Sequence, residues 1–174
     1  IKKETNEIIF GIYDPATTGI PVNFWSRIDS KVFQGLSSDL LSDPNSFATN
    51  YTIKKIFFSK VNLSEFDDKG ISYLNFISFF LAKQKDIDLI DSVINQNNLL
   101  LNNEKLLNYL INDNFASYEI NKTCKYATQL GAEISNFELQ KFKVFCLVQA
   151  KENRKALAQL ELMKEAGFKD SFFV

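Results

Sequence analysis

The chain has 174 residues, of which 45% are hydrophobic and 14% aromatic, with a formal net charge of −1. This composition excludes a disordered tail, and only two of the twenty basic residues are arginines (Arg27 and Arg154), which argues against a nucleic-acid groove. No apolar run approaches the roughly 18 residues that a membrane span requires, so we expect no span.

The two ends and the amino-acid usage suggest the protein's origin. The sequence begins with Ile1 and stops at Val174, where a new helical pattern starts, so we expect a piece of a longer protein. Abundant Asn, Lys, Ile and Phe, with scarce Arg and no His, resemble the usage of an AT-rich bacterial genome. We therefore expect a bacterial protein, either periplasmic after removal of a leader or cytoplasmic.

The opening segment, residues 1–21, predicts an irregular N-terminal cap. Its apolar run 8–13 can lie as a strand or coil across exposed helix faces, and Asp14-Pro15 and Gly19 favour turns. Gly11 and Gly19 are eight residues apart and no Gly-Lys-Ser/Thr follows, which excludes a phosphate-binding loop. The alternative is an arm that binds a partner or docks another domain.

From Val22 onward, apolar residues recur at helical spacing. The first predicted helix carries its apolar face on Trp25, Ile28, Val32, Leu36 and Leu40. A first helix pair is predicted over 22–61, followed by a polar connection over 62–70. Further pairs are predicted over 71–97, 103–131 and 135–167, and 170–174 begins another helix. Seventeen phenylalanines are expected mainly to fill the core, and an exposed remainder would mark a protein-binding groove.

Apolar residues also recur at a longer, nearly constant interval. One series is Leu74, Leu107 and Leu139, and a second is Ile77, Leu110 and Phe142. A period near 34, built from two helices, is typical of stacked helical hairpins. From 69 to 174 the layout resembles tetratricopeptide-type α-solenoids, although no tryptophan lies in the first helix of a repeat and no proline closes one. The resemblance implies a concave surface, lined by the first helices, that binds a peptide or a folded protein.

The predicted fold is therefore all-α: a right-handed α-solenoid of stacked antiparallel helix hairpins with an irregular N-terminal cap. Partner-binding side chains are expected on the first helices and at the C-terminal end, where an apolar surface would continue the array or allow self-association. These candidates are Tyr73, Asn75, Asn108, Gln140, Lys143, Phe168, Phe172 and Phe173.

The sequence offers few combinations of residues that could form a catalytic or metal-binding site. The chain has no histidine, and two dispersed cysteines cannot build a zinc site, so we expect no metal, no cofactor and no enzymatic activity. If Cys124 and Cys146 lie on an antiparallel hairpin that turns near 132–134, they are staggered by roughly 6 Å along the helix axes. We therefore expect free thiols.

The sequence predicts a non-catalytic protein–protein interaction or scaffold module of a larger protein. Two alternatives stay open: a helical accessory domain of a larger cell-envelope enzyme, and a helical bundle that binds a small apolar ligand. The expected partner is a protein or peptide and not a nucleic acid.

Overall fold

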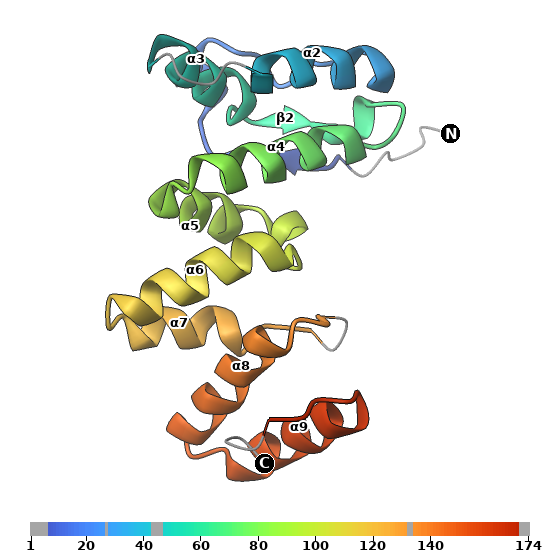
Figure 1. The fold of residues 1–174 in the computed structure, drawn as a ribbon. Helices are drawn as coiled ribbons and strands as arrows, with labels where there is room; N and C mark the ends of the chain where they lie inside the picture. The colour runs from blue at the N-terminus through green and yellow to red at the C-terminus, as the bar shows by residue number, and fades with distance from the viewer. Residues whose placement is uncertain (1–6, 27, 43–46, 132–133, 171–174) are drawn as a thin grey trace. The chain divides into compact units, whose positions relative to one another are not determined.

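The computed structural model describes residues 7–26, 28–42, 47–131 and 134–170 (Figure 1). Within these ranges the chain is mostly helical, and its strands form a single two-stranded antiparallel sheet. The predicted helical class is confirmed as a mostly α fold, and the small sheet departs from the all-α prediction. The chain divides into two compact units, Ile1–Leu101 and Asn102–Val174.

In the first unit, the N-terminal segment is held by a short sheet. Strand β1 (Ile9–Phe10) pairs with β2 (Val61–Asn62), so that Ile9 faces Asn62 and Phe10 faces Val61. A single helical turn, α1 (Pro15–Thr18), follows and is capped by the Asp14 side chain, which accepts a hydrogen bond from the Ala16 N–H. The segment predicted as an irregular cap thus contributes a strand to this unit.

Gly11, directly after β1, lies against the backbone of the opposite segment. Its φ is +129°, and a Cβ built there would lie 2.5 Å from the Ser59 carbonyl oxygen. The Gly11 N–H donates a 2.9 Å hydrogen bond to Oδ1 of the buried Asn97. A residue without a Cβ is therefore required where these two segments meet.

The next two helices differ from their predicted bounds. Helix α2 (Ser30–Ser42) begins eight residues after Val22, because the Asp29 carboxylate caps it by accepting hydrogen bonds from the Lys31 and Val32 N–H groups. Helix α3 (Phe47–Phe57) ends before the predicted Val61. The reason is tertiary: the Phe58 carbonyl accepts hydrogen bonds from the N–H groups of the N-terminal segment at positions 12 and 13.

An aromatic core joins α2 and α3 to α4 (Ile71–Gln84). The ring of Phe57 lies 4.5 Å from that of Phe76, and the ring of Phe33 lies 5.4 Å from that of Tyr73, measured between centroids. Trp25 stacks on Phe57 at 5.0 Å. These rings are buried or half-buried, so core packing accounts for these aromatic side chains, whereas Phe24 and Phe79 of the same unit are exposed.

The unit is completed by three short elements. The 3₁₀ turn η1 (Leu63–Glu65) follows β2, and α5 (Ile87–Gln96) and a second 3₁₀ turn, η2 (Asn98–Leu100), follow α4. Asp86 starts α5: its Oδ1 accepts from the Leu89 N–H, and its Oδ2 lies 2.6 Å from Nζ of Lys54 on α3. This ion pair ties α3 to the start of α5.

The second unit consists of two consecutive helical hairpins. The first is formed by α6 (Glu104–Ala116) and α7 (Ile120–Ala127), and the second by α8 (Phe137–Gln149) and α9 (Asn153–Glu165) (Figure 1). Asn103 and Asn136 cap α6 and α8 by accepting hydrogen bonds from first-turn N–H groups. The core of the second hairpin is formed by Val144, Leu147, Ala156, Met163 and Phe168, with Phe137 and Leu160 packed against it.

The starting residues of the helices recur along both units at one constant spacing in the sequence, from 71 to 104 to 137, which we call the helix-start interval. Helices α4, α6 and α8 begin at Ile71, Glu104 and Phe137, and helices α5, α7 and α9 begin at Ile87, Ile120 and Asn153. The residue that reverses the chain between the two helices is left-handed each time: Lys85 at φ 53°, Tyr118 at φ 61° and Lys151 at φ 61°. With this interval, Leu139 is equivalent to Leu106. The sequence pattern had suggested Leu107 instead.

The cysteines are not free thiols. Cys124 on α7 and Cys146 on α8 form a disulfide, with their Cα atoms 5.2 Å apart. The expectation was wrong because it counted residues along two unbroken helices to a shared turn. Helix α7 already ends at Ala127 and α8 begins only at Phe137, so residue counting does not give the position along the helix axes.

Candidate functional site

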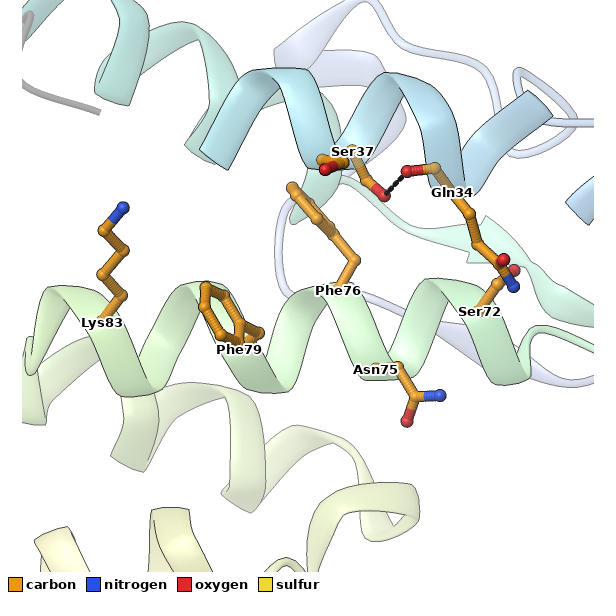
Figure 2. Close-up of a pocket in the computed structure, with 8 residues that line it drawn as sticks. Gln34, Ser37, Ser72, Asn75, Phe76, Phe79 and Lys83 are labelled. Carbon is orange, nitrogen blue, oxygen red and sulfur yellow. Dashed lines mark hydrogen bonds between the residues drawn. The ribbon is translucent and has the colours of Figure 1, made fainter. Parts of the chain in front are cut away.

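A groove of about 590 Å³ lies between α2 and α4, and we call it the α2/α4 groove (Figure 2). It is lined by Gln34, Ser37 and Ser38 of α2 and by Ser72, Asn75, Phe76, Phe79 and Lys83 of α4. Phe76 and Lys83 project from α4 toward α2 in Figure 2. Phe76 is buried, whereas Phe79 is 53% exposed, so the groove offers an aromatic surface to an incoming group.

One end of the groove is fixed by the loop that precedes α4. Asp68 accepts hydrogen bonds from the N–H groups of Gly70 and Ser72, at 3.0 and 2.8 Å. Burial raises the pKa of the Asp68 carboxyl, but these bonds and the nearby Ser72 hydroxyl outweigh it and lower that pKa below its usual value. The Ser72 Oγ is buried and has no hydrogen bond of good geometry among the described residues.

A second concave site, within the second unit, lies between α6 and α8. We call it the phenylalanine cleft, and it is lined by Phe115, Glu138, Lys141, Phe142 and Phe145, around a volume of about 220 Å³. The ring of Phe115 lies 5.1 Å from that of Phe142 and 5.8 Å from that of Phe145, both edge to face. Phe115 remains 40% exposed.

The two sites are lined by the same positions of their helices. In α4 the lining residues include Ser72, Asn75, Phe76 and Phe79, and in α8 they are Glu138, Lys141, Phe142 and Phe145. Each residue of the second set follows its counterpart in the first by twice the helix-start interval. The same face of α4 and of α8 therefore lines a concave site at equivalent positions of the two helices.

The charges of the two sites differ. In the phenylalanine cleft, Lys141 Nζ lies 2.8 Å from Glu138 Oε1 and 2.8 Å from Asp170 Oδ2. Hydrogen bonds to Asp170 and Glu138 hold the pKa of the Lys141 ammonium above its usual value, so the ammonium stays charged. The equivalent positions of the α2/α4 groove, Ser72 and Asn75, are uncharged.

Two of the predicted partner-binding residues belong to the interior. Tyr73 is fully buried and its hydroxyl donates a 2.6 Å hydrogen bond to the Phe57 carbonyl, and burial raises the pKa of that hydroxyl. Gln140 is 4% exposed and its amide donates to the Ile134 carbonyl at 2.9 Å. The prediction was wrong for both, because helical spacing alone does not show which face of a helix meets solvent.

The other helix candidates lie at or near the surface. Asn75 is exposed and lines the α2/α4 groove, so the structure brings this one candidate to a concave site. Asn108 is half-buried, and its side-chain and backbone oxygens both accept from the Asn112 side chain. Lys143 is half-buried and its ammonium donates to the Leu130 carbonyl, which gives it a structural contact in the connection before α8.

The predicted C-terminal apolar surface is not formed by Phe168. This residue is 9% exposed and packs on Phe137, with ring centroids 5.2 Å apart, inside the core of the second hairpin. The sequence placed it beyond the last helix, but α9 is followed by a turn at Gly167 (φ +93°) that returns the chain to α8. Phe172 and Phe173 lie outside the described residues.

Sequence reasoning missed most of the lining residues, polar and aromatic alike, and the aromatic ones are the most informative. Phe79 and the three phenylalanines of the cleft were expected as general core filling. The spacing of the helix starts could have identified these phenylalanines, because it makes Phe76 equivalent to Phe142 and Phe79 equivalent to Phe145. It was missed because the apolar residues were aligned one position out of register.

In the part of the chain that the structure describes, no group of histidine, cysteine, aspartate and glutamate side chains could hold a metal ion. None of the described helices is long and apolar enough to cross a membrane. No protein-family model, curated protein or solved structure matches this chain.

Proposed function

We propose that this chain is a non-catalytic protein-interaction module of a larger protein, built as a right-handed α-solenoid of helix hairpins. The observation that carries the proposal is the recurrence of a concave, aromatic-lined site at the same positions of α4 and α8. Helices that begin at a constant interval in sequence and carry a concave site on the same face are typical of repeat proteins that bind partners.

The chemistry of the sites also supports binding. Exposed phenylalanine rings favour contact with apolar side chains, because contact removes both surfaces from water. Neighbouring hydroxyl and amide groups, such as those of Ser38 and Asn75, can bond to the backbone of an extended peptide. The aromatic and polar lining of both sites therefore suits the side chains and backbone of a protein partner.

A peptide selection tests the proposal. The intact chain is exposed to a random dodecapeptide library displayed on phage, and enriched peptides are synthesised and their affinities measured by fluorescence polarisation. We expect Phe79→Ala or Phe145→Ala to weaken at least one enriched family by about tenfold or more. Leu157→Ala is the matched control, because Leu157 is an exposed apolar residue on α9 that lines neither site.

Two outcomes would contradict the proposal. One is a selection in which no peptide is enriched above the background of the uncoated support. The other is a set of binders whose affinity is the same for the wild type, both phenylalanine variants and the control, which would mean that neither concave site is used.

A further inference from the structure

The phenylalanine cleft has a shape suited to one side chain. Its volume of about 220 Å³ is below the range of about 300 to 1,000 Å³ that is usual for small-molecule pockets, but it accommodates a single large apolar side chain. The Phe115 ring contacts the rings of Phe142 and Phe145, both half-buried, edge to face, so the three rings form one continuous aromatic surface of the cleft. An aliphatic or aromatic group placed on this surface would be desolvated together with the exposed parts of the rings.

A cluster of charged side chains lies at the cleft. Among the described residues that line the cleft, Lys141 is the only cation, and it is shared between the carboxylates of Glu138 and Asp170. Asp170 lies outside the lining residues, and together with it this cluster of two carboxylates and one ammonium has a formal charge of −1. The Glu138 side chain is 70% exposed, so its carboxylate can accept further hydrogen bonds from a partner.

The α2/α4 groove offers an internal comparison. It has the same two aromatic positions, Phe76 and Phe79, but the residue equivalent to Glu138 is the neutral Ser72. Its lining, as far as the structure describes it, includes Lys83 and no carboxylate. The shared face thus supplies the aromatic surface, and the charged residues Glu138 and Lys141, together with Asp170, make the electrostatic difference between the two sites.

We propose that the phenylalanine cleft binds a protein segment in which a large apolar side chain lies within about one helical turn of a lysine or arginine. The apolar side chain packs against the exposed surfaces of the phenylalanine rings, and the basic group pairs with the Glu138 carboxylate. This inference rests on the proposed function and adds the chemistry of the partner at one of its two sites.

Nuclear magnetic resonance of the ¹⁵N-labelled full chain tests the inference with two defined probes, acetyl-Leu-Ser-Ser-Arg-amide and acetyl-Leu-Ser-Ser-Glu-amide. We expect the arginine peptide to shift the amide signals of Phe115 and of 141–145, and to bind about threefold or more tightly than the glutamate peptide. The preference should weaken as salt is added, because the pairing occurs at a solvated surface.

Two variants locate the binding. Glu138→Lys replaces an exposed carboxylate without removing core contacts, and we expect it to reverse the preference between the two peptides. Phe115→Ala is expected to lower the affinity for both by about tenfold. Leu157→Ala, exposed in the same unit, should change neither affinity.

The outcomes separate this inference from the proposed function. Equal shifts by both peptides, or shifts confined to the α2/α4 groove, would overturn the inference while the interaction module stands. The inference also fails if the peptides enriched from the random library bind at the cleft through acidic residues. If the library yields no binder at all, the proposed function fails as well.

Discussion

At Gly11, two backbone segments approach so closely that no side chain fits between them. We predict that Gly11→Ala lowers the free energy of unfolding by about 2 kcal/mol or more, because φ +129° disfavours alanine and the new Cβ would overlap the Ser59 carbonyl. Gly35→Ala is the control: a Cβ there meets no atom within 4 Å in the interior of α2, and we expect a gain of about 1 kcal/mol. Urea denaturation followed by circular dichroism measures both, and a stable Gly11→Ala variant would contradict the described packing of the N-terminal segment.

Asp86 makes stability depend on pH. Partial burial raises the pKa of its carboxyl, but the hydrogen bond and charge of Lys54 and the Leu89 N–H outweigh it, so the folded-state pKa lies below its ordinary value of 3.8. The stabilisation is therefore complete above pH 3.8 and is lost as the pH falls through the lower, folded-state pKa.

We predict that Asp86→Asn, which keeps a capping oxygen but removes the charge, lowers stability by about 0.5 kcal/mol at pH 7. The difference from the wild type should shrink and vanish as the pH is lowered through the folded-state pKa. Thermal unfolding measured across pH tests this, with Asp88→Asn, exposed in the same helix turn, as the control. A difference that is constant with pH would show that the ion pair with Lys54 does not contribute.

At the scale of elements, the turns between paired helices share one conformational requirement. The left-handed region is unfavourable for residues with a side chain, yet Lys85, Tyr118 and Lys151 all adopt it. We predict that replacing each of them in turn by glycine raises the stability by about 0.5 to 1 kcal/mol. Lys122→Gly, in α7, should instead lower it by about 1 kcal/mol.

Chemical denaturation of the four variants measures these effects. Because the three turn residues occupy the same position of the helix-start interval, their gains should agree within a few tenths of a kcal/mol. A gain at one turn and a loss at another would show that the three turns are not equivalent, and would count against a repeat.

The disulfide staples α7 to α8 across a sequence separation of 22 residues. Closing a loop of this length in the unfolded chain gives about 3 kcal/mol of stability, so we predict that reduction, or Cys124→Ala with Cys146→Ala, lowers the free energy of unfolding by about that amount. Alkylation and mass spectrometry of protein purified without reductant provide the check on its formation. Incorporation of two alkyl groups before reduction would show that the bond is not formed.

Helix existence followed from the sequence, whereas helix boundaries did not. Periodic apolar residues predicted α4 through α9 because one face of each helix must be buried. The start of α2 and the end of α3 were misplaced, because the former is fixed by the Asp29 cap and the latter by hydrogen bonds from the distant N-terminal segment. Such contacts between residues far apart in sequence leave no periodic signal.

At the scale of the whole molecule, the division into two compact units predicts that loss of the disulfide affects only the unit that contains it. Hydrogen exchange should accelerate on reduction of the disulfide in amides of the second unit, 102–174, and remain unchanged in the first. Mass spectrometry of peptic fragments, with and without reductant, measures this. Faster exchange throughout 7–101 would show that the two units unfold as one cooperative block.

The sequence by itself determined the mostly helical class, the near-constant interval and the absence of histidine chemistry, because these depend on residue type and on spacing along one helix. Tertiary structure alone decided the burial of Tyr73, the pairing of Cys124 with Cys146 and the lining of the two concave sites. Each of these depends on which faces of separate helices meet. An error of one residue in aligning the helices shifts the predicted face of a helix by about 100°. It therefore changes which residues are predicted to meet another helix.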